Sequence, residues 1–261
     1  MFFAFDGKNL DDYHFGGSAD KPRIVTNLTD YVQLFQNAPA TSMAGEASTL
    51  YLYDKDAPAR IATRIPKVKL IAILRNPVDR AYSQFQHYRQ VKREPLSRFV
   101  ETINVEQKRM AENWYPSYFY ADMGFYGRQL RNYFQYFPRD QFKIFLYEDL
   151  ADTASVTGEI FDFIGVERNV DLDTSGRYNV SGETRFPALF KLVRKSTRIK
   201  PFLKRLIDQK NWQKMKQTWD RFIQKKYAPM LEEDREKMKS IFHDDILDLQ
   251  DLIDRDLSSW L

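Results

Sequence analysis

Arg75 and Ser83 are the two side chains in this sequence whose types and spacing best suit the binding of a phosphate group. Residues 69–74 form an apolar run rich in β-forming residues, so we expect a strand that ends directly before Arg75. Asn76 and Pro77 then favour the start of a helix. We therefore expect Arg75 at the carboxyl edge of a sheet and beside a helix N-terminus, where open α/β folds bind anions.

Ser83 follows Asn76 by seven residues, or two helical turns, which places its hydroxyl about 10 Å further along the same helix face. A guanidinium can donate two parallel hydrogen bonds to a phosphate, and a serine hydroxyl can add a neutral donor. The alternative interpretation is structural: Arg75 forms a salt bridge with Asp79, and Ser83 is merely exposed.

Two apolar runs and three helical patterns define the architecture expected around this motif. Residues 69–74 and 142–147 are predicted to be buried strands. The predicted helices span residues 77–92, 126–137 and 156–164. This alternation is typical of an α/β protein with a mostly parallel sheet flanked by helices, and the sequence from about residue 187 onward favours helix throughout.

The composition of the 261 residues excludes several kinds of site and setting. There is no cysteine, which excludes thiol catalysis and disulfide bonds, and the three histidines are too scattered for a metal site, so we expect no metal. No apolar run approaches the roughly 20 residues needed to cross a bilayer, and the amino-terminal sequence does not resemble a secretory signal. We therefore expect a cytoplasmic protein.

Residues 186–227 are strongly basic, with 13 Lys or Arg against two Asp, whereas residues 228–261 carry ten acidic residues against four basic ones. A basic segment of this kind can bind a polyanion, an anionic membrane surface or nucleic acid. It can equally be the solvated face of a helix. We do not expect nucleic acid as a partner, and polyanion binding is one hypothesis for this segment.

The motif at Arg75 resembles part of a known family, the sulfotransferases that use 3′-phosphoadenosine 5′-phosphosulfate (PAPS), especially bacterial members similar to heparan-sulfate sulfotransferases. The string RNPVDRAYS, residues 75–83, is similar to that family's 3′-phosphate-binding motif. Five further segments are similar in order and approximate spacing: GEASTLYLY (45–53), FYGRQLRNYFQYFPRDQFKIFLYEDL (125–150), IFDFIGV (160–166), RYNVSGETR (177–185) and DILDLQDLIDRDLSSWL (245–261). The resemblance covers nearly the whole chain.

The resemblance implies both a fold and a reaction. The fold would be the P-loop-NTPase-like sulfotransferase fold in a single domain over residues 1–261, with an α/β core in residues 1–185 and a helical region in residues 186–261. The reaction would move a sulfuryl group from PAPS, as co-substrate, to an acceptor hydroxyl. The expected acceptor is a carbohydrate, another polyanion or a small molecule.

The resemblance also assigns residues that bind the co-substrate. Arg75 and Ser83 would hold the 3′-phosphate of PAPS. Residues 179–185 match a family loop near the same phosphate, which makes Asn179, Gly182 and Arg185 further candidates. Gly182 would allow close approach of the backbone, and Arg185 would add a positive charge. The alternative is a surface turn before the next helix.

The family's 5′-phosphosulfate loop has no counterpart in this sequence. In the family a strand, a Gly-rich loop with Lys and Thr or Ser, and a helix hold that group, whereas here only residues 15–23 (FGGSADKPR) are glycine-rich, without the flanking patterns. No G-x-x-x-x-G-K-[ST] occurs, which disfavours transfer from ATP or GTP. Residues 1–17 resemble the family segment that comes after the loop and helix, where a Lys-Glu pair supplies the catalytic carboxylate just before two phenylalanines. We therefore expect a chain shortened at its N-terminus that also lacks this general base.

Three other side chains are candidates for a general base: Glu46, His14 and His87. Glu46 belongs to a segment that matches the family, and the two histidines can titrate near neutral pH. For each of the three, a structural or surface role is the alternative. If the chain is active, Lys8 or Lys21 would have to replace the missing loop.

Three hypotheses of function remain open. The chain is a shortened PAPS-dependent sulfotransferase, or a reduced and inactive relative that binds a ligand or partner, or a polyanion-binding protein that acts through residues 186–227. Sulfuryl transfer depends on positioning and on stabilising charge at the leaving phosphate, which the 5′ loop would supply. We therefore expect this sequence to transfer sulfate poorly or not at all.

Overall fold

The structure is a computed structural model that describes residues 1–16, 21–39, 41–168, 183–184, 224–225 and 228–261. The chain divides into two units, Met1–Gly176 with Met230–Leu261, and Arg177–Pro229. The described part of the second unit includes a short antiparallel pair, β3 (Glu183–Thr184) and β4 (Gln224–Lys225). The elements that position the candidate site all belong to the first unit.

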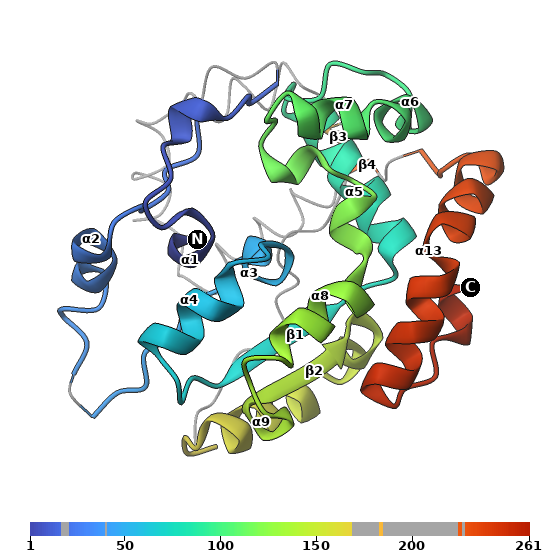
Figure 1. The fold of residues 1–261 in the computed structure, drawn as a ribbon. Helices are drawn as coiled ribbons and strands as arrows, with labels where there is room; N and C mark the ends of the chain where they lie inside the picture. Colours follow the sequence, from blue (N-terminus) through green and yellow to red (C-terminus); the bar gives the residue numbers. More distant parts are fainter. Residues whose placement is uncertain (17–20, 40, 169–182, 185–223, 226–227) are drawn as a thin grey trace, which may run out of the picture. The chain divides into compact units, whose positions relative to one another are not determined.

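The two apolar runs form a parallel pair of strands, β1 (Leu70–Leu74) and β2 (Phe142–Leu146), with Leu74 opposite Leu146 (Figure 1). Leu, Ile and Phe dominate both runs, and such side chains pack well on a pleated surface. Because parallel strands in register end at the same edge, the residues that follow them, Arg75 and Tyr147, lie at one edge of the sheet.

One face of β1 is exposed, although the sequence predicts a buried strand. Leu74 is 1% exposed, whereas Ile71 is 39% and Ile73 is 48% exposed. In the part of the chain that the structure describes, the parallel sheet consists of these two strands, which are the two that the sequence predicts. A continuous apolar run does not reveal whether one or both faces of a strand are covered, which explains the difference.

Helix α5 (Pro77–Gln90) follows β1 directly and matches the predicted helix. The Asn76 side chain caps it by accepting hydrogen bonds from the backbone N–H groups of Val78 (2.9 Å) and Asp79 (3.3 Å). Proline at the first helical position needs no intrahelical hydrogen bond there. The cap and the proline together fix the N-terminus of α5 beside the end of β1.

Helix α13 (Glu232–Ile253) packs along α8 (Tyr126–Tyr133), as Figure 1 shows. The carboxylate of Asp245 accepts hydrogen bonds from the backbone N–H groups of Gly127 (3.0 Å) and Arg128 (3.1 Å) at the start of α8. A carboxylate is stabilising at a helix N-terminus because it faces the positive end of the helix dipole. The contact therefore ties the two helices together across 118 residues of sequence.

The other elements of the first unit are mostly short. Helix α9 (Thr153–Ile164) agrees with the third predicted helix and ends at Gly165, whose φ of 75° favours glycine. The remaining α-helices are α1 (Phe2–Phe5), α2 (Leu28–Gln33), α3 (Thr49–Tyr53), α4 (Ala57–Arg64), α6 (Phe99–Asn104) and α7 (Glu106–Ala111). The 3₁₀ helices are η1 (Leu10–Asp12), η2 (Pro116–Tyr118), η3 (Asp122–Gly124), η4 (Arg139–Gln141), η5 (Tyr147–Asp152) and η6 (Ser258–Trp260). Among the described residues, no helix combines the length and the apolar character needed to cross a membrane.

Aromatic rings fill much of the core of the first unit. Tyr118, Tyr120, Phe5 and Phe242 are each no more than 1% exposed. Their neighbours include further rings in edge-to-face contact; the Phe85 and Tyr120 rings, for example, lie 6.1 Å apart between centroids. The high aromatic content therefore serves packing, because each large ring buries a large apolar area.

The carboxyl-terminal region is only partly helical in the described residues. Helix α13 and η6 agree with the prediction, whereas β4 falls in a stretch predicted to be helical. A strand of two residues is too short to show the alternation of apolar and polar residues by which a strand is recognised in a sequence. Residues 185–223 and 226–227, which include most of the basic segment, lie outside the described residues.

Candidate functional site

The shared edge of β1 and β2 carries a cation over an aromatic ring. The guanidinium carbon of Arg75 lies 5.1 Å from the centroid of the Tyr147 ring. This is within the range of a cation–π contact. Arg75 is partly buried, whereas Tyr147 is 54% exposed. The contact therefore holds Arg75 at an open edge of the sheet.

Arg75 does not use its charge in a salt bridge within the described residues. The alternative interpretation of the motif, an ion pair with Asp79, is wrong, because Asp79 Oδ1 accepts a hydrogen bond from Arg235 Nη2 of α13 at 2.9 Å. The described part of the chain supplies no other carboxylate that pairs with Arg75. Its guanidinium is therefore available to an anionic ligand.

Ser83 lies on α5, two turns from the helix start, and is partly buried. Its hydroxyl has no hydrogen-bond partner among the residues that the structure describes. Arg75 and Ser83 thus stand at the strand end and on the helix that follows it, as the spacing predicts. Both have polar groups free to donate to a ligand.

Arg80, on α5, is a second arginine whose charge acts on Arg75. Arg80 donates from Nη2 to the backbone carbonyl of Tyr120, while its buried Nε has no partner among the described residues. Burial lowers the pKa of Arg80, and the neighbouring Arg75 contributes in the same direction, whereas Tyr126 and Glu106 oppose them. The two guanidinium groups are therefore close enough to interact, and their fields add at the edge.

Glu106, at the start of α7, is a buried carboxyl that no pattern in the sequence singled out. It is 6% exposed and accepts hydrogen bonds from the backbone N–H groups of Ala121 (2.9 Å) and Asp122 (2.8 Å). Burial raises its pKa to about 7, although these hydrogen bonds and Arg80 act in the opposite direction. Its partners lie 15 and 16 residues away, so no local pattern marks it.

Glu46, the first candidate base, is engaged with two phenols. Its Oε1 accepts hydrogen bonds from the hydroxyls of Tyr31 (3.0 Å) and Tyr51, and its Oε2 lies 3.8 Å from the amino group of Met1. Burial raises the pKa of both tyrosines, and Glu46 contributes to the increase. Glu46 therefore connects α2, α3 and the chain start, and no described contact links it to Arg75.

The two candidate histidines, His14 and His87, have contacts different from those of Glu46. The His14 ring stacks on Trp114, with 4.3 Å between centroids, and its Nδ1 accepts a hydrogen bond from the Gly16 N–H (3.1 Å). His87 is on α5, one turn beyond Ser83. Partial burial lowers its pKa, and Arg93 acts in the same direction. Among the described contacts, none brings His14, His87 and Glu46 together.

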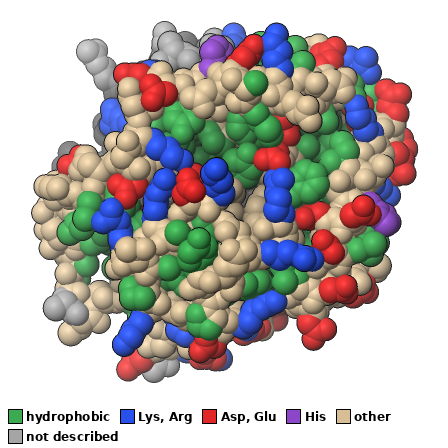
Figure 2. Space-filling view, in the orientation of Figure 1, with side chains coloured by type: hydrophobic (Ala, Val, Ile, Leu, Met, Phe, Trp, Pro, Cys, Tyr) green, Lys and Arg blue, Asp and Glu red, His purple; other side chains and the backbone are tan. Residues whose placement is uncertain are grey.

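Lys8 and Lys21, the candidate replacements for the 5′ loop, are both paired with carboxylates. Lys8 Nζ lies 2.8 Å from Asp54 Oδ2, and Lys21 pairs with Asp11. Charged side chains of both signs are mixed on the face shown in Figure 2. These lysines therefore differ from Arg75, whose charge has no such partner in the described residues.

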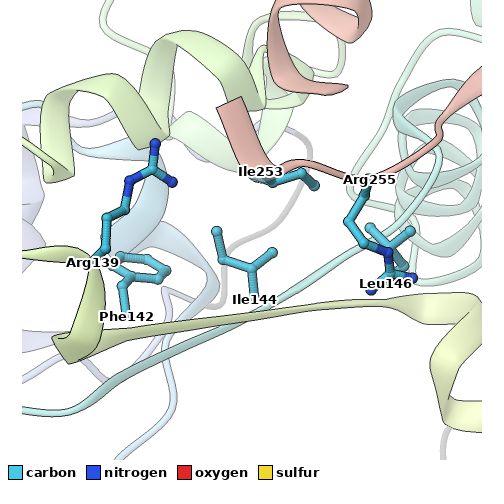
Figure 3. Close-up of a pocket in the computed structure, with 6 residues that line it drawn as sticks. All are labelled: Arg139, Phe142, Ile144, Leu146, Ile253 and Arg255. Carbon is cyan, nitrogen blue, oxygen red and sulfur yellow. The ribbon is translucent and has the colours of Figure 1, made fainter. Parts of the chain in front are cut away.

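A pocket of about 260 Å³ lies over the core face of β2 (Figure 3). Its lining consists of Phe142, Ile144, Leu146 and Ile253, with Arg139 and Arg255 at its two ends. Arg139 lies over the Phe134 ring at 3.6 Å, and Arg255 pairs with Asp149 at 2.8 Å. The pocket thus combines an apolar floor with a guanidinium at each end, and it does not include Arg75 or Ser83.

Asn179, Gly182 and Arg185, the other residues expected near the 3′-phosphate, lie outside the described residues. Their assignment stays a prediction.

Comparison with known proteins identifies the family of this chain. Residues 58–249 match the sulfotransferase domain family. Over 261 residues the chain is 28% identical to the bifunctional heparan sulfate N-deacetylase/N-sulfotransferase 3 of Mus musculus. This alignment covers 97% of this chain and 27% of that protein. It is 29% identical over 150 residues to the heparan sulfate glucosamine 3-O-sulfotransferase 6 of Mus musculus, covering 56% of this chain and 41% of that protein. The chain thus spans about a quarter to two fifths of these relatives.

A solved structure shows the same fold. The crystal structure of a sulfotransferase from Alicyclobacillus acidocaldarius superposes with a TM-score of 0.70 at 25% sequence identity, covering 99% of this chain and 84% of that one. The match to the family includes β1, α5, α8, β2 and α9. The chain belongs to the sulfotransferase domain family.

Proposed function

We propose that this chain binds PAPS through Arg75 and Ser83 at its 3′-phosphate and serves sulfuryl transfer to an acceptor hydroxyl. The observation that carries the proposal is Arg75: a guanidinium at the carboxyl edge of two parallel strands, beside a capped helix N-terminus, with no carboxylate partner in the described residues. Family membership independently favours PAPS as the co-substrate.

The donor groups at this edge fit a phosphate. Arg75 can donate two parallel hydrogen bonds from its planar fork, and Ser83 can add a neutral donor from the helix. Arg80 and the N-terminus of α5 add positive potential without occupying the phosphate themselves. Bound PAPS would supply the activated sulfuryl group, and the role of these residues is to anchor its nucleotide end so that the acceptor can approach in line.

We propose a carbohydrate as the acceptor, because both mammalian relatives are named for heparan sulfate. The hydroxyl as the accepting group follows the name of the 3-O-sulfotransferase, whereas the other relative is named an N-sulfotransferase. We assign no general base. Glu46 already accepts two phenolic hydrogen bonds, and neither histidine contacts Arg75 or Ser83 in the described residues.

Calorimetric titration with adenosine 3′,5′-bisphosphate tests the binding proposal. Arg75→Ala removes a charged fork and should weaken binding by ~1.5 to 3 kcal/mol, roughly 10- to 100-fold, and Ser83→Ala should weaken it less. Arg139→Ala is a matched control, since Arg139 is an exposed arginine whose guanidinium lies over Phe134. Unchanged affinity in both site variants would overturn the assignment.

An assay of labelled sulfate transfer from PAPS to glycan and phenolic acceptors then distinguishes an active enzyme from a protein that only binds the nucleotide. Turnover that falls in parallel with bisphosphate affinity in Arg75→Ala identifies an enzyme. Binding without turnover on the whole panel identifies a relative that retains the nucleotide site alone.

A further inference from the structure

The pocket over the core face of β2 has no role in the proposed function so far. Its floor consists of alternate residues of one strand, Phe142, Ile144 and Leu146, which share one face of the sheet. A parallel strand rises about 3.3 Å per residue, so this floor is about 13 Å long. Ile253, the last residue of α13, lies over the floor (Figure 3). The pocket is therefore an elongated apolar cavity that follows β2.

The apolar side chains of this cavity are not fully covered by the protein. Phe142, Ile144 and Ile253 are only partly buried, although all three pack against the main core. An apolar group that covered them would release the water in contact with them, which favours binding. The cavity of about 260 Å³ is slightly smaller than the roughly 300 to 1,000 Å³ of most ligand sites. Its size therefore favours a small and slender ligand.

The end of the cavity beside Leu146 carries a cation that is already neutralised. Arg255 donates hydrogen bonds to both carboxylate oxygens of Asp149, at 2.8 and 3.2 Å. Asp149 Oδ2 also accepts a hydrogen bond from the backbone N–H of Leu146 at 2.8 Å. An anionic ligand at this end would have to compete with the carboxylate of Asp149 for the same guanidinium. This end therefore favours the uncharged part of a ligand.

The opposite end carries a cation without a carboxylate partner in the described residues. Arg139 belongs to η4, and its guanidinium carbon lies 3.6 Å from the centroid of the Phe134 ring. The Phe134 ring meets Phe142 of the floor edge-on, with 5.6 Å between centroids. A guanidinium that lies over a ring keeps its N–H edges available to an acceptor. Arg139 can therefore donate to an anionic group at this end of the cavity.

We propose that the cavity binds an amphipathic monoanion, an alkyl carboxylate of medium length, with its head group on Arg139 and its chain along β2. A carboxylate can accept two parallel hydrogen bonds from one guanidinium. The apolar chain would cover the partly exposed floor, and its end would lie near the neutral pair of Arg255 and Asp149. The cavity does not include Arg75 or Ser83, so this inference does not rest on the proposed function.

Octanoate is the probe for this site, and NMR of the δ1 methyl groups of Ile144 and Ile253 reports where it binds. Titration should shift both methyl resonances with one common dissociation constant. Affinity should increase about two- to fourfold with each CH₂ group from butanoate to octanoate, because each added group covers more of the floor. 1-Octanol has the same chain without the charge, and it should bind about tenfold more weakly than octanoate.

Two arginine variants locate the head group. Arg139→Gln should weaken octanoate binding by about tenfold and leave 1-octanol binding unchanged, because only the carboxylate needs the guanidinium. Arg131→Gln is the matched control. Arg131 is also an exposed arginine, but it lies in the last turn of α8, pairs with Asp248 at 3.0 Å and does not line the cavity. This variant should bind octanoate as the wild type does.

Three results would overturn the proposal. Unchanged resonances of both isoleucines at millimolar octanoate would show that the cavity does not bind the chain. Equal losses in Arg139→Gln and Arg131→Gln would assign the effect to the general positive charge of the surface. Equal affinities for octanoate and 1-octanol would mean that the cavity selects an apolar chain without an anionic head. Methyl resonances remote from the cavity should match those of the wild type in both variants, which verifies that each is folded.

Discussion

Arg109 and Arg75 both lie over aromatic rings, but only Arg109 also forms an ion pair with a carboxylate in the described residues. The guanidinium carbon of Arg109 lies 4.6 Å from the centroid of Trp114, and its two Nη atoms donate to the two oxygens of Glu94 at 2.8 and 2.7 Å. Arg109 is 3% exposed. Arg75 has a ring but no carboxylate in the described residues, and it is partly buried.

The difference separates a structural arginine from a binding arginine. Glu94 also accepts hydrogen bonds from the Tyr120 hydroxyl (2.8 Å) and the Leu96 N–H (2.9 Å), so the buried carboxylate is saturated. A ligand could reach Arg109 only by breaking a buried pair, at a cost of several kcal/mol. Arg75 requires no such exchange. Two arginines with the same kind of ring contact therefore differ in what their charges can bind.

The largest effect is expected from breaking the buried pair. Arg109→Met leaves Glu94 buried without its cation, and we expect the free energy of unfolding to fall by ~3 to 5 kcal/mol in chemical denaturation. Folded protein of this variant should still bind adenosine 3′,5′-bisphosphate with wild-type affinity, because Arg109 does not belong to the binding edge.

A double variant is the control for that prediction. Glu94→Gln with Arg109→Met removes both charges, so it should be more stable than Arg109→Met alone. A loss below about 1 kcal/mol in Arg109→Met would contradict the burial of the pair. If folded Arg109→Met lost affinity for the nucleotide, Arg109 would belong to the binding site and would not be a purely structural residue.

Arg80 is an intermediate case, because its guanidinium is only partly satisfied and interacts with the buried Glu106. Burial raises the pKa of Glu106 to about 7, above its ordinary value of 4.5, so the folded state holds this proton more tightly than the unfolded state. The stability from this proton is fully present below about pH 4.5 and is lost as the pH rises to about 7. The expected loss is roughly 3 kcal/mol, measured by denaturation across this range.

Glu106→Gln supplies the control, since it cannot titrate. The difference in stability between the wild type and this variant should change with pH between about 4.5 and 7 and should be constant above about pH 8. A difference that is independent of pH throughout would mean that the pKa of Glu106 is the same in the folded and unfolded states, which would contradict the expected increase.

The fold was predictable from the sequence where the signal is local. The runs that form β1 and β2, the Asn76 cap and the start of α5 follow from periodicity and from capping chemistry. The exposed face of β1 could not be predicted, because an apolar run is the same whether one face or two are covered. The pair β3 and β4 has strands too short to show a period.

The candidate site was predictable only as far as its own segment reaches. The position of Arg75 at a strand end and of Ser83 on the next helix follows from the eight-residue spacing. The partner of Asp79 could not be predicted, since Arg235 lies 156 residues away. Glu94, Glu106 and Tyr147 were missed for the same reason: their significance comes from contacts across the fold, and no local pattern marks them.

The smallest effect is expected at Asp79, on which the contrast between Arg75 and Arg109 depends. If Asp79 pairs with Arg235, as at 2.9 Å here, Asp79→Asn breaks a half-exposed ion pair and should cost at most about 1 kcal/mol of stability. Bisphosphate affinity, measured by calorimetry, should change by less than about threefold, because Arg75 was never engaged. Arg235→Gln should give a similar small loss of stability and serves as the matched control. If Arg75 were instead held by Asp79 in solution, Asp79→Asn would free the guanidinium and tighten bisphosphate binding by about tenfold or more. Arg75 would then be a salt-bridged residue like Arg109, and the distinction between the two would disappear.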